Sequence, residues 1–241
     1  PSAKYALLVD KLRQKLYIFE AGAIIGELDV STGLNNAKQP YNESPADEYI
    51  TVSKVGDFNA GSGTIGRFAI RINGGTLHHE VLHDTAKDGT RIYTQYEAQL
   101  GMKASHGCIR IQRRANAQGQ NMQWLWNNLE NKTKVLIWDD QGRQMYEPEL
   151  PDGGLQLYRN PKGGSNYHAD ANCPGVKEKY LPLTGDFTYG DLEKDEFKKL
   201  TPCSACGAPV RPETLYERYV FEANQIGAEV TDEVKAKFGI E

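Results

Sequence analysis

Several features that would assign the chain to a common functional class are missing from its sequence. No block of Lys and Arg stands out, and the net charge is −4 with a pI near 5.8. The lack of a basic patch argues against nucleic acid as a partner. No apolar run approaches the roughly 20 residues that a transmembrane helix needs. An ATP-binding motif and the glycine fingerprint of dinucleotide-binding folds are also missing, which argues against a nucleotide-dependent enzyme.

The composition that is present favours a folded, globular chain. Hydrophobic residues make up 39% and charged residues 25% of the 241 positions, so a packed core is feasible. This length suits one large domain or two modest ones. The sequence begins at Pro1 without a methionine. We therefore expect any signal peptide or anchor to lie outside it.

Cysteine is scarce, and one of the four cysteines stands apart from the others. Cys108 lies in the stretch Ala104–Ile111, which holds a histidine, a cysteine and an arginine within five positions. A nucleophilic cysteine must be a thiolate, and a neighbouring imidazole or cation lowers its pKa. Gly107 allows the backbone to approach a substrate closely. The alternative interpretation is a buried structural cysteine in a strand.

The wider context favours the catalytic interpretation. Val81-Leu82-His83-Asp84-Thr85 lies upstream, and Ser105-His106-Gly107-Cys108-Ile109-Arg110 follows. This arrangement resembles the L,D-transpeptidase family, also called YkuD, whose signature is a histidine, a spacer and a Ser/Thr-His-Gly-Cys block. The spacer at 84–104 has 21 residues (104 − 83), which is longer than usual in the family, and Asp84 stands where the family often has Gly.

The resemblance implies a covalent acyl-transfer enzyme that acts on peptidoglycan stem peptides. A cysteine thioester forms at the third residue of a tetrapeptide stem as D-alanine leaves, and the amine of a second stem then closes a 3→3 crosslink. An L,D-carboxypeptidase or another cysteine peptidase of cell-wall peptides shares the thioester and stays an alternative. A non-catalytic wall-binding module is a further one. The reaction needs no cofactor, and the enzyme is expected to work outside the cytoplasm.

The resemblance also implies roles for the residues of the motif. Cys108 is the expected nucleophile, and His83 the expected general base. The backbone carbonyl of Asp84 would orient the other ring nitrogen of His83. The backbone N–H groups of Gly107 and Cys108 are candidates for the oxyanion hole.

Three further residues of the block are expected to contact or support the substrate. Arg110 would anchor a substrate carboxylate with its planar guanidinium group. His106 would line the site, and Ser105 would fix the turn by hydrogen bonding. His78 and His79 have no motif partner, and we expect them in a loop or at the surface.

The pattern of apolar residues predicts a mainly β catalytic domain, an antiparallel sandwich or barrel-like structure with a short helix. Strands are expected at 5–9, 15–20, 23–30, 49–55, 68–72 and 133–138, and a helix within 116–131. Gly56–Gly66 is glycine-rich and reads as a loop. The family resemblance covers roughly residues 4–140. We expect domains at 1–147 and 148–241, the second a small α+β module.

The small module carries its own cysteine and histidine pattern. His168, Cys173, Cys203 and Cys206 are spaced as His-x₄-Cys, then twenty-nine residues, then Cys-x₂-Cys. Four such ligands suit a tetrahedral structural zinc. A disulfide from Cys173 to Cys203 or Cys206 is the alternative, and it would leave an odd thiol.

Overall fold

The computed structural model describes residues 3–36 and 38–240 and divides the chain into two compact units, Pro1–Arg143 and Gln144–Glu241. The boundary expected from the sequence lies between 147 and 148. Within the described residues, no helix has the length and apolar character needed to cross a membrane.

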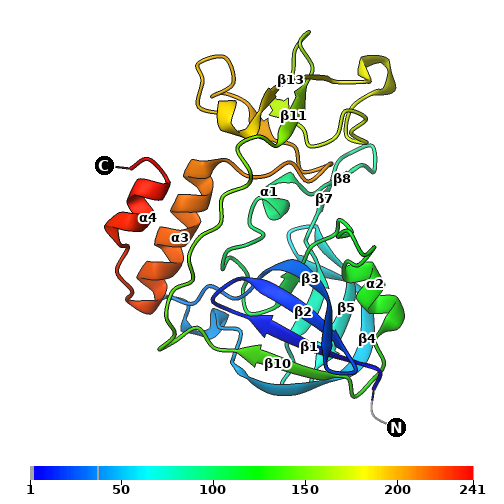
Figure 1. Cartoon of the computed structure of the whole chain (residues 1–241). Coiled ribbons are helices and arrows are strands. Elements are labelled where there is room, and N and C mark those ends of the chain that lie inside the picture. Colours follow the sequence, from blue (N-terminus) through cyan, green and yellow to red (C-terminus); the bar gives the residue numbers. More distant parts are fainter. Residues whose placement is uncertain (1–2, 37, 241) are drawn as a thin grey trace. The chain divides into compact units, whose positions relative to one another are not determined.

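The first unit is a closed β-barrel (Figure 1). Around the barrel the strands follow the order β1-β10-β4-β5-β6-β9-β3-β2. Their bounds are β1 Tyr5–Asp10, β2 Lys15–Glu20, β3 Ala23–Ser31, β4 Asp47–Gly61, β5 Thr64–Ile72, β6 Leu77–Glu80, β9 Ile109–Ile111 and β10 Lys134–Trp138. A 3₁₀ turn, η1 (Pro40–Asn42), joins β3 to β4, and helix α2 (Met122–Asn128) joins β9 to β10.

Alternation of side chains explains why these segments close around one core. Six of the strands each bury a pair of apolar residues two positions apart, as expected where one face of a strand points inward. These pairs are Leu7 and Val9, Leu16 and Ile18, Leu28 and Val30, Ile70 and Ile72, Ile109 and Ile111, and Val135 and Ile137. Helix α2 adds Met122 and Leu125 to the same core. The mainly β barrel fold expected from the sequence is confirmed.

Two details of the barrel differ from expectation. The glycine-rich segment is not a loop, because β4 runs to Gly61 and β5 begins at Thr64. Several register shifts within this hairpin accommodate its glycines. The sheet is also not wholly antiparallel, since β1 pairs with β10 and β6 with β9 in parallel. The helix expected within 116–131 is present as α2.

The long spacer between the two motif segments folds as an insertion. Strands β7 (Asp84–Thr85) and β8 (Arg91–Ile92) form a small antiparallel hairpin. Helix α1 (Thr94–Glu97) follows the hairpin.

The second unit is a small α+β structure. Strands β11 (Gln156–Arg159) and β13 (Thr184–Thr188) are antiparallel, whereas β12 (Asn166–Tyr167) and β14 (Thr201–Pro202) are parallel. The remaining elements are the 3₁₀ turns η2 (Glu178–Tyr180) and η3 (Tyr189–Asp191) and the helices α3 (Pro212–Ile226) and α4 (Asp232–Lys237). A stacked pair, Phe187 and Phe197, lies in its core.

Candidate functional site

Cys108 comes directly before the short central strand β9. This strand lies between β3 and β6, so backbone ladders hold it on both sides. The Cys108 side chain is partly exposed, unlike the isoleucines at 109 and 111, which are fully buried. The structural interpretation, a buried cysteine inside a strand, therefore does not describe this position.

Two hydrogen bonds from one serine fix the turn that carries the cysteine. Ser105 Oγ donates to the Cys108 carbonyl oxygen at 2.5 Å and accepts from the Gly107 N–H at 3.1 Å. Gly107 has a φ of +111°, a region that residues with a side chain rarely adopt. Because the Gly107 N–H already donates to Ser105 Oγ, it can bind a substrate oxygen only after that hydrogen bond opens.

A second segment, Glu43–Pro45, supports the same turn from a distant part of the chain. Ser44 is fully buried, and its hydroxyl donates to the Gly107 carbonyl oxygen at 2.8 Å. The same hydroxyl accepts from the Gly33 N–H at 2.9 Å. Lys11 pairs with Glu43 at 2.5 Å and holds the start of the segment. The cysteine turn is thus held by hydrogen bonds from Ser105, which belongs to the turn, and from Ser44, which belongs to a distant segment.

His78 and His79 lie in strand β6, and both are only 2% exposed. The expectation that they belong to a loop or the surface was wrong. The parallel pairing of β6 with β9 makes His79 the partner of Arg110. Cys108 stands two positions before Arg110, so the Cα atoms of His79 and Cys108 are roughly 8 Å apart by strand geometry.

The ring of His79 is held at a definite tautomer. Its Nδ1 lies 2.6 Å from the carbonyl oxygen of Glu80, which can only accept. The hydrogen therefore sits on Nδ1, and Nε2 is left as the acceptor. Burial lowers the pKa of His79 to about 4; the Glu80 carbonyl raises it, and the Arg110 charge lowers it further. The imidazole is neutral at neutral pH.

Close packing surrounds His79 on the side of the β4–β5 hairpin. The ring of Phe58 meets the imidazole edge-on, with centroids 5.0 Å apart. A side chain at Gly66 would come within 2.3 Å of the Phe58 ring and 3.2 Å of His79 Nδ1. Glycine at this position is therefore what allows the two rings to pack.

His83 lies three residues beyond Glu80, where strand β6 ends. It forms an isolated bridge with Ile65, and its Nδ1 lies 3.2 Å from the Asp84 carbonyl oxygen. Between these points the chain still follows β9, because the Val81 N–H donates to the Ile111 carbonyl. In a parallel pair this direction leads away from Cys108 by about 3.3 Å for each residue.

The Asp84 side chain anchors the insertion rather than the cysteine turn. Its carboxylate accepts from Thr64 Oγ1 at 2.8 Å, from Gln95 Nε2 at 2.6 Å and from the Tyr96 hydroxyl at 3.4 Å. These bonds connect the start of β5, helix α1 and the β7–β8 hairpin. The backbone beside His83 is rigid as a result.

Arg110 and His106 have different surroundings. Arg110 is 5% exposed, donates to Gln99 Oε1, and lies with its guanidinium carbon 5.7 Å from the centre of the Tyr96 ring. Burial lowers the pKa of Arg110, while the neighbouring Tyr96 and Cys108 raise it. Arg110 therefore adds positive charge beside both Cys108 and His79. His106, in contrast, is exposed.

The cysteines and histidine of the second unit also converge. The ligand atoms of His168, Cys173, Cys203 and Cys206 all lie within 4.8 Å of one another.

Comparison with known proteins agrees with the geometry of the first unit. Residues 4–137, more than half of the chain, match the YkuD family model, the L,D-transpeptidase catalytic domain. The chain belongs to this family. This chain is 30% identical over 133 residues to YciB of Bacillus subtilis (strain 168), which carries the name of an L,D-transpeptidase. That alignment spans 54% of this chain and 63% of the relative's length.

Solved structures of L,D-transpeptidases are also similar to this chain, at lower identity. One from Mycobacterium smegmatis is 16% identical with a TM-score of 0.41, covering 57% of this chain and 59% of the other. One from Mycobacterium tuberculosis H37Rv is 18% identical with a TM-score of 0.42, covering 56% and 58%.

Proposed function

We propose that the chain is a cysteine-dependent L,D-transpeptidase that acts on the tetrapeptide stems of peptidoglycan. The observation that carries this proposal is the YkuD family match over residues 4–137. The turn around Cys108 supports it, because a partly exposed thiol sits on a rigid loop beside a buried cation. The enzyme works outside the cytoplasm, where stem peptides are accessible, and its acyl exchange uses no cofactor.

The proposed reaction forms and breaks one bond in each half. Cys108 Sγ attacks the carbonyl of the diamino acid at the third position of the stem, and the peptide bond to D-alanine breaks. The thiol proton passes through the base to the leaving amine, which leaves a thioester. The amine of a second stem then attacks the thioester, and Cys108 recovers its proton.

We assign the role of base to His79 in place of His83. The β6–β9 register supports this assignment, since it brings His79 next to Arg110 and leaves His83 displaced away from Cys108. His79 is neutral, and its Nε2 is free of the Glu80 carbonyl, as a proton acceptor requires. The Glu80 carbonyl takes over the orienting role that was expected of Asp84.

The remaining roles follow from what each group already binds. The Gly107 N–H is engaged by Ser105 Oγ, so the Cys108 N–H is the primary candidate for the oxyanion contact. Arg110 keeps guanidinium donors beyond the one that Gln99 accepts, and these suit a substrate carboxylate. His106, which is exposed, lines the approach to the site.

An L,D-carboxypeptidase shares every step up to the thioester and differs only in its acceptor. Purified tetrapeptide stems, incubated with the enzyme with and without an acceptor stem, separate the two by mass spectrometry. A transpeptidase gives a crosslinked dimer that has lost one D-alanine. A carboxypeptidase gives only tripeptide, and a wall-binding module leaves the stems unchanged.

A further inference from the structure

The four metal-ligand candidates of the second unit are positioned by separate backbone contacts. Strands β12 and β14 pair Tyr167 with Pro202, so the next residues, His168 and Cys203, leave this ladder side by side. The Cys203 N–H donates to the Tyr167 carbonyl at 2.9 Å. His168 is also fixed from the other side, where it exchanges two backbone hydrogen bonds with Tyr158 at 2.8 and 2.9 Å.

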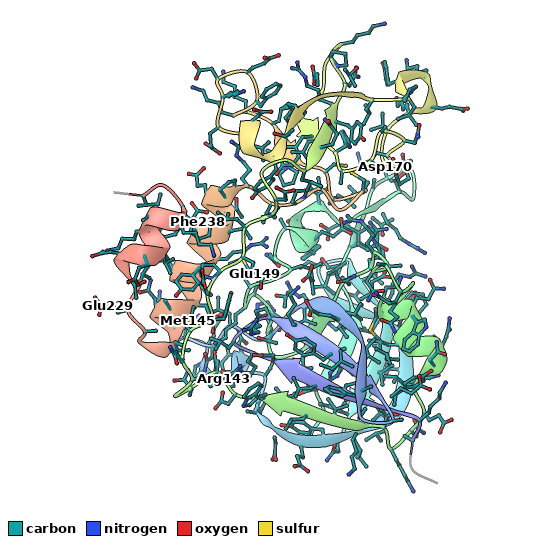
Figure 2. All side chains as sticks on the ribbon, viewed as in Figure 1. Arg143, Met145, Glu149, Asp170, Glu229 and Phe238 are labelled. Atoms are coloured by element: carbon teal, nitrogen blue, oxygen red, sulfur yellow. The ribbon has the colours of Figure 1, made fainter. Side chains whose placement is uncertain are left out.

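The other two cysteines sit in tight turns. The Cys173 N–H donates to the carbonyl of Asp170, labelled in Figure 2, at 3.2 Å. Cys206 ends the Cys-x₂-Cys turn, and the following Ala208 N–H donates to the Cys203 carbonyl at 3.2 Å. Each ligand candidate therefore has a defined place before any ion binds.

The spacing of the ligand atoms fits a tetrahedron around zinc. With Zn–S near 2.3 Å and Zn–N near 2.05 Å, the edges of a tetrahedral site are about 3.8 Å for S···S and about 3.6 Å for S···N. Cys173 Sγ lies 3.7 Å from Cys203 Sγ, and Cys206 Sγ lies 3.7 Å from His168 Nδ1. A disulfide would require sulfurs about 2.05 Å apart.

Backbone N–H groups point at the sulfurs, as is favourable for thiolates. The Ala169 N–H donates to Cys206 Sγ at 3.3 Å, and the Gly175 N–H donates to Cys173 Sγ at 3.4 Å. Gly175 has no room for a side chain, because a Cβ there would meet Ala205 at 2.4 Å. Its close approach keeps the N–H within reach of the sulfur.

We propose that His168, Cys173, Cys203 and Cys206 bind one zinc ion in a structural site. Soft thiolate and imidazole ligands in a tetrahedral set select zinc over the hard cations. Four protein ligands leave no open position, which is typical of a structural site and not of a catalytic one. The ion connects two loops, 168–176 and 203–208, in a unit whose core cluster has six buried residues.

The test is the metal content of the full-length chain, purified without chelator and measured by elemental analysis. The expected result is about one zinc per chain in the wild type and in Cys108→Ser, the matched cysteine control. Cys203→Ser and His168→Ala should lose the metal. Stoichiometric zinc in both variants would overturn the site. So would metal-free wild-type protein whose mass lies two hydrogens below the fully reduced chain, because that result identifies a disulfide.

A cobalt titration covers the case in which the variants fold poorly. The full-length wild-type chain, stripped of metal with chelator under reducing conditions, should develop the intense visible absorption of tetrahedral cobalt thiolate. The signal should saturate at about one equivalent and disappear on addition of zinc. Absorption that is absent, or that is typical of octahedral cobalt, would overturn the proposal. The readout is independent of acyl transfer, so it stands apart from the proposed function.

Discussion

His79 and Arg110 are register partners in the parallel pair of strands β6 and β9. Arg110 lies two residues after Cys108, so this one pairing brings a histidine, a cation and the candidate nucleophile into one region. The neighbouring histidine in sequence, His83, is carried away from that region by the direction of the strand. The proposed assignment of the base depends on this register and not on the spacing of the motif.

The first prediction separates the two histidines. His79→Gln should lower kcat/KM for thioester formation by the 10²–10⁴-fold typical of losing a general base. His83→Gln should lower it by less than about tenfold, because His83 lies beyond the end of β6 that is farther from Cys108. The measurement is the rate of Cys108 acylation by stem peptide or carbapenem.

Far-ultraviolet circular dichroism of both variants controls for folding. If His83→Gln loses the rate while His79→Gln keeps it, the assignment made from the motif is correct and the one made from the register is wrong.

The second prediction concerns the support of the cysteine turn. Ser44→Ala removes a buried hydroxyl that bonds both Gly107 and Gly33. Two buried backbone groups lose a partner, so the free energy of unfolding should fall by about 1–3 kcal/mol. The rate of acylation should fall as well, because the turn that carries Cys108 loosens. Ser44→Thr keeps the hydroxyl and is the matched control, and equal losses in both variants would contradict the hydrogen-bonding role.

The third prediction uses the burial of His78. Within the described part of the chain, neither ring nitrogen of His78 has a hydrogen-bond partner. Burial lowers its pKa from 6.5 to about 3, with a smaller contribution from His79. Below pH 6.5 the unfolded chain binds a proton that the folded chain excludes. Stability is therefore full above pH 6.5 and falls with pH, by up to about 1.4 kcal/mol per pH unit for this residue.

His78→Leu should remove this part of the pH dependence and raise the free energy of unfolding at pH 7 by about 1–3 kcal/mol, since a buried unpaired polar group disappears. Urea unfolding at pH 7 and pH 5 measures both effects. The exposed His106→Gln is the control and should leave the slope unchanged. A His78→Leu variant as acid-sensitive as wild type would exclude His78 as a source of the pH dependence.

Local pattern was sufficient for most of the barrel. Apolar residues two positions apart predict a strand, because the inward face of a barrel strand must be apolar. Examples are Leu16 and Ile18 in 15–20 and Val135 and Ile137 in 133–138. Helix α3 shows the same kind of local signal, because it begins at Pro212 and ends before Gly227, whose φ is +68°. In both cases the signal lies within a few consecutive residues.

The parts of the fold and of the site that the local sequence pattern did not predict depend on contacts between residues far apart in the chain. Strand β6, with the sequence Leu-His-His-Glu, has one large apolar residue and no alternation, so its burial between β5 and β9 left no trace in the sequence. The residues at 56–66 contain glycines that usually indicate a loop, yet the hairpin partner completes the strand. The hydrogen bond from Ser44 to Gly107 spans 63 positions, so no local sequence pattern could reveal it.

The most direct test of the central claim is the identity of the acylated residue. A carbapenem provides a probe, because its strained ring is an acyl donor. Intact-mass analysis of the full-length chain, followed by peptide mapping, should find one adduct, on Cys108, and none in Cys108→Ala. An adduct on Cys203 or Cys206, or a Cys108→Ala variant that still accepts the carbapenem and still crosslinks stems, would contradict the account.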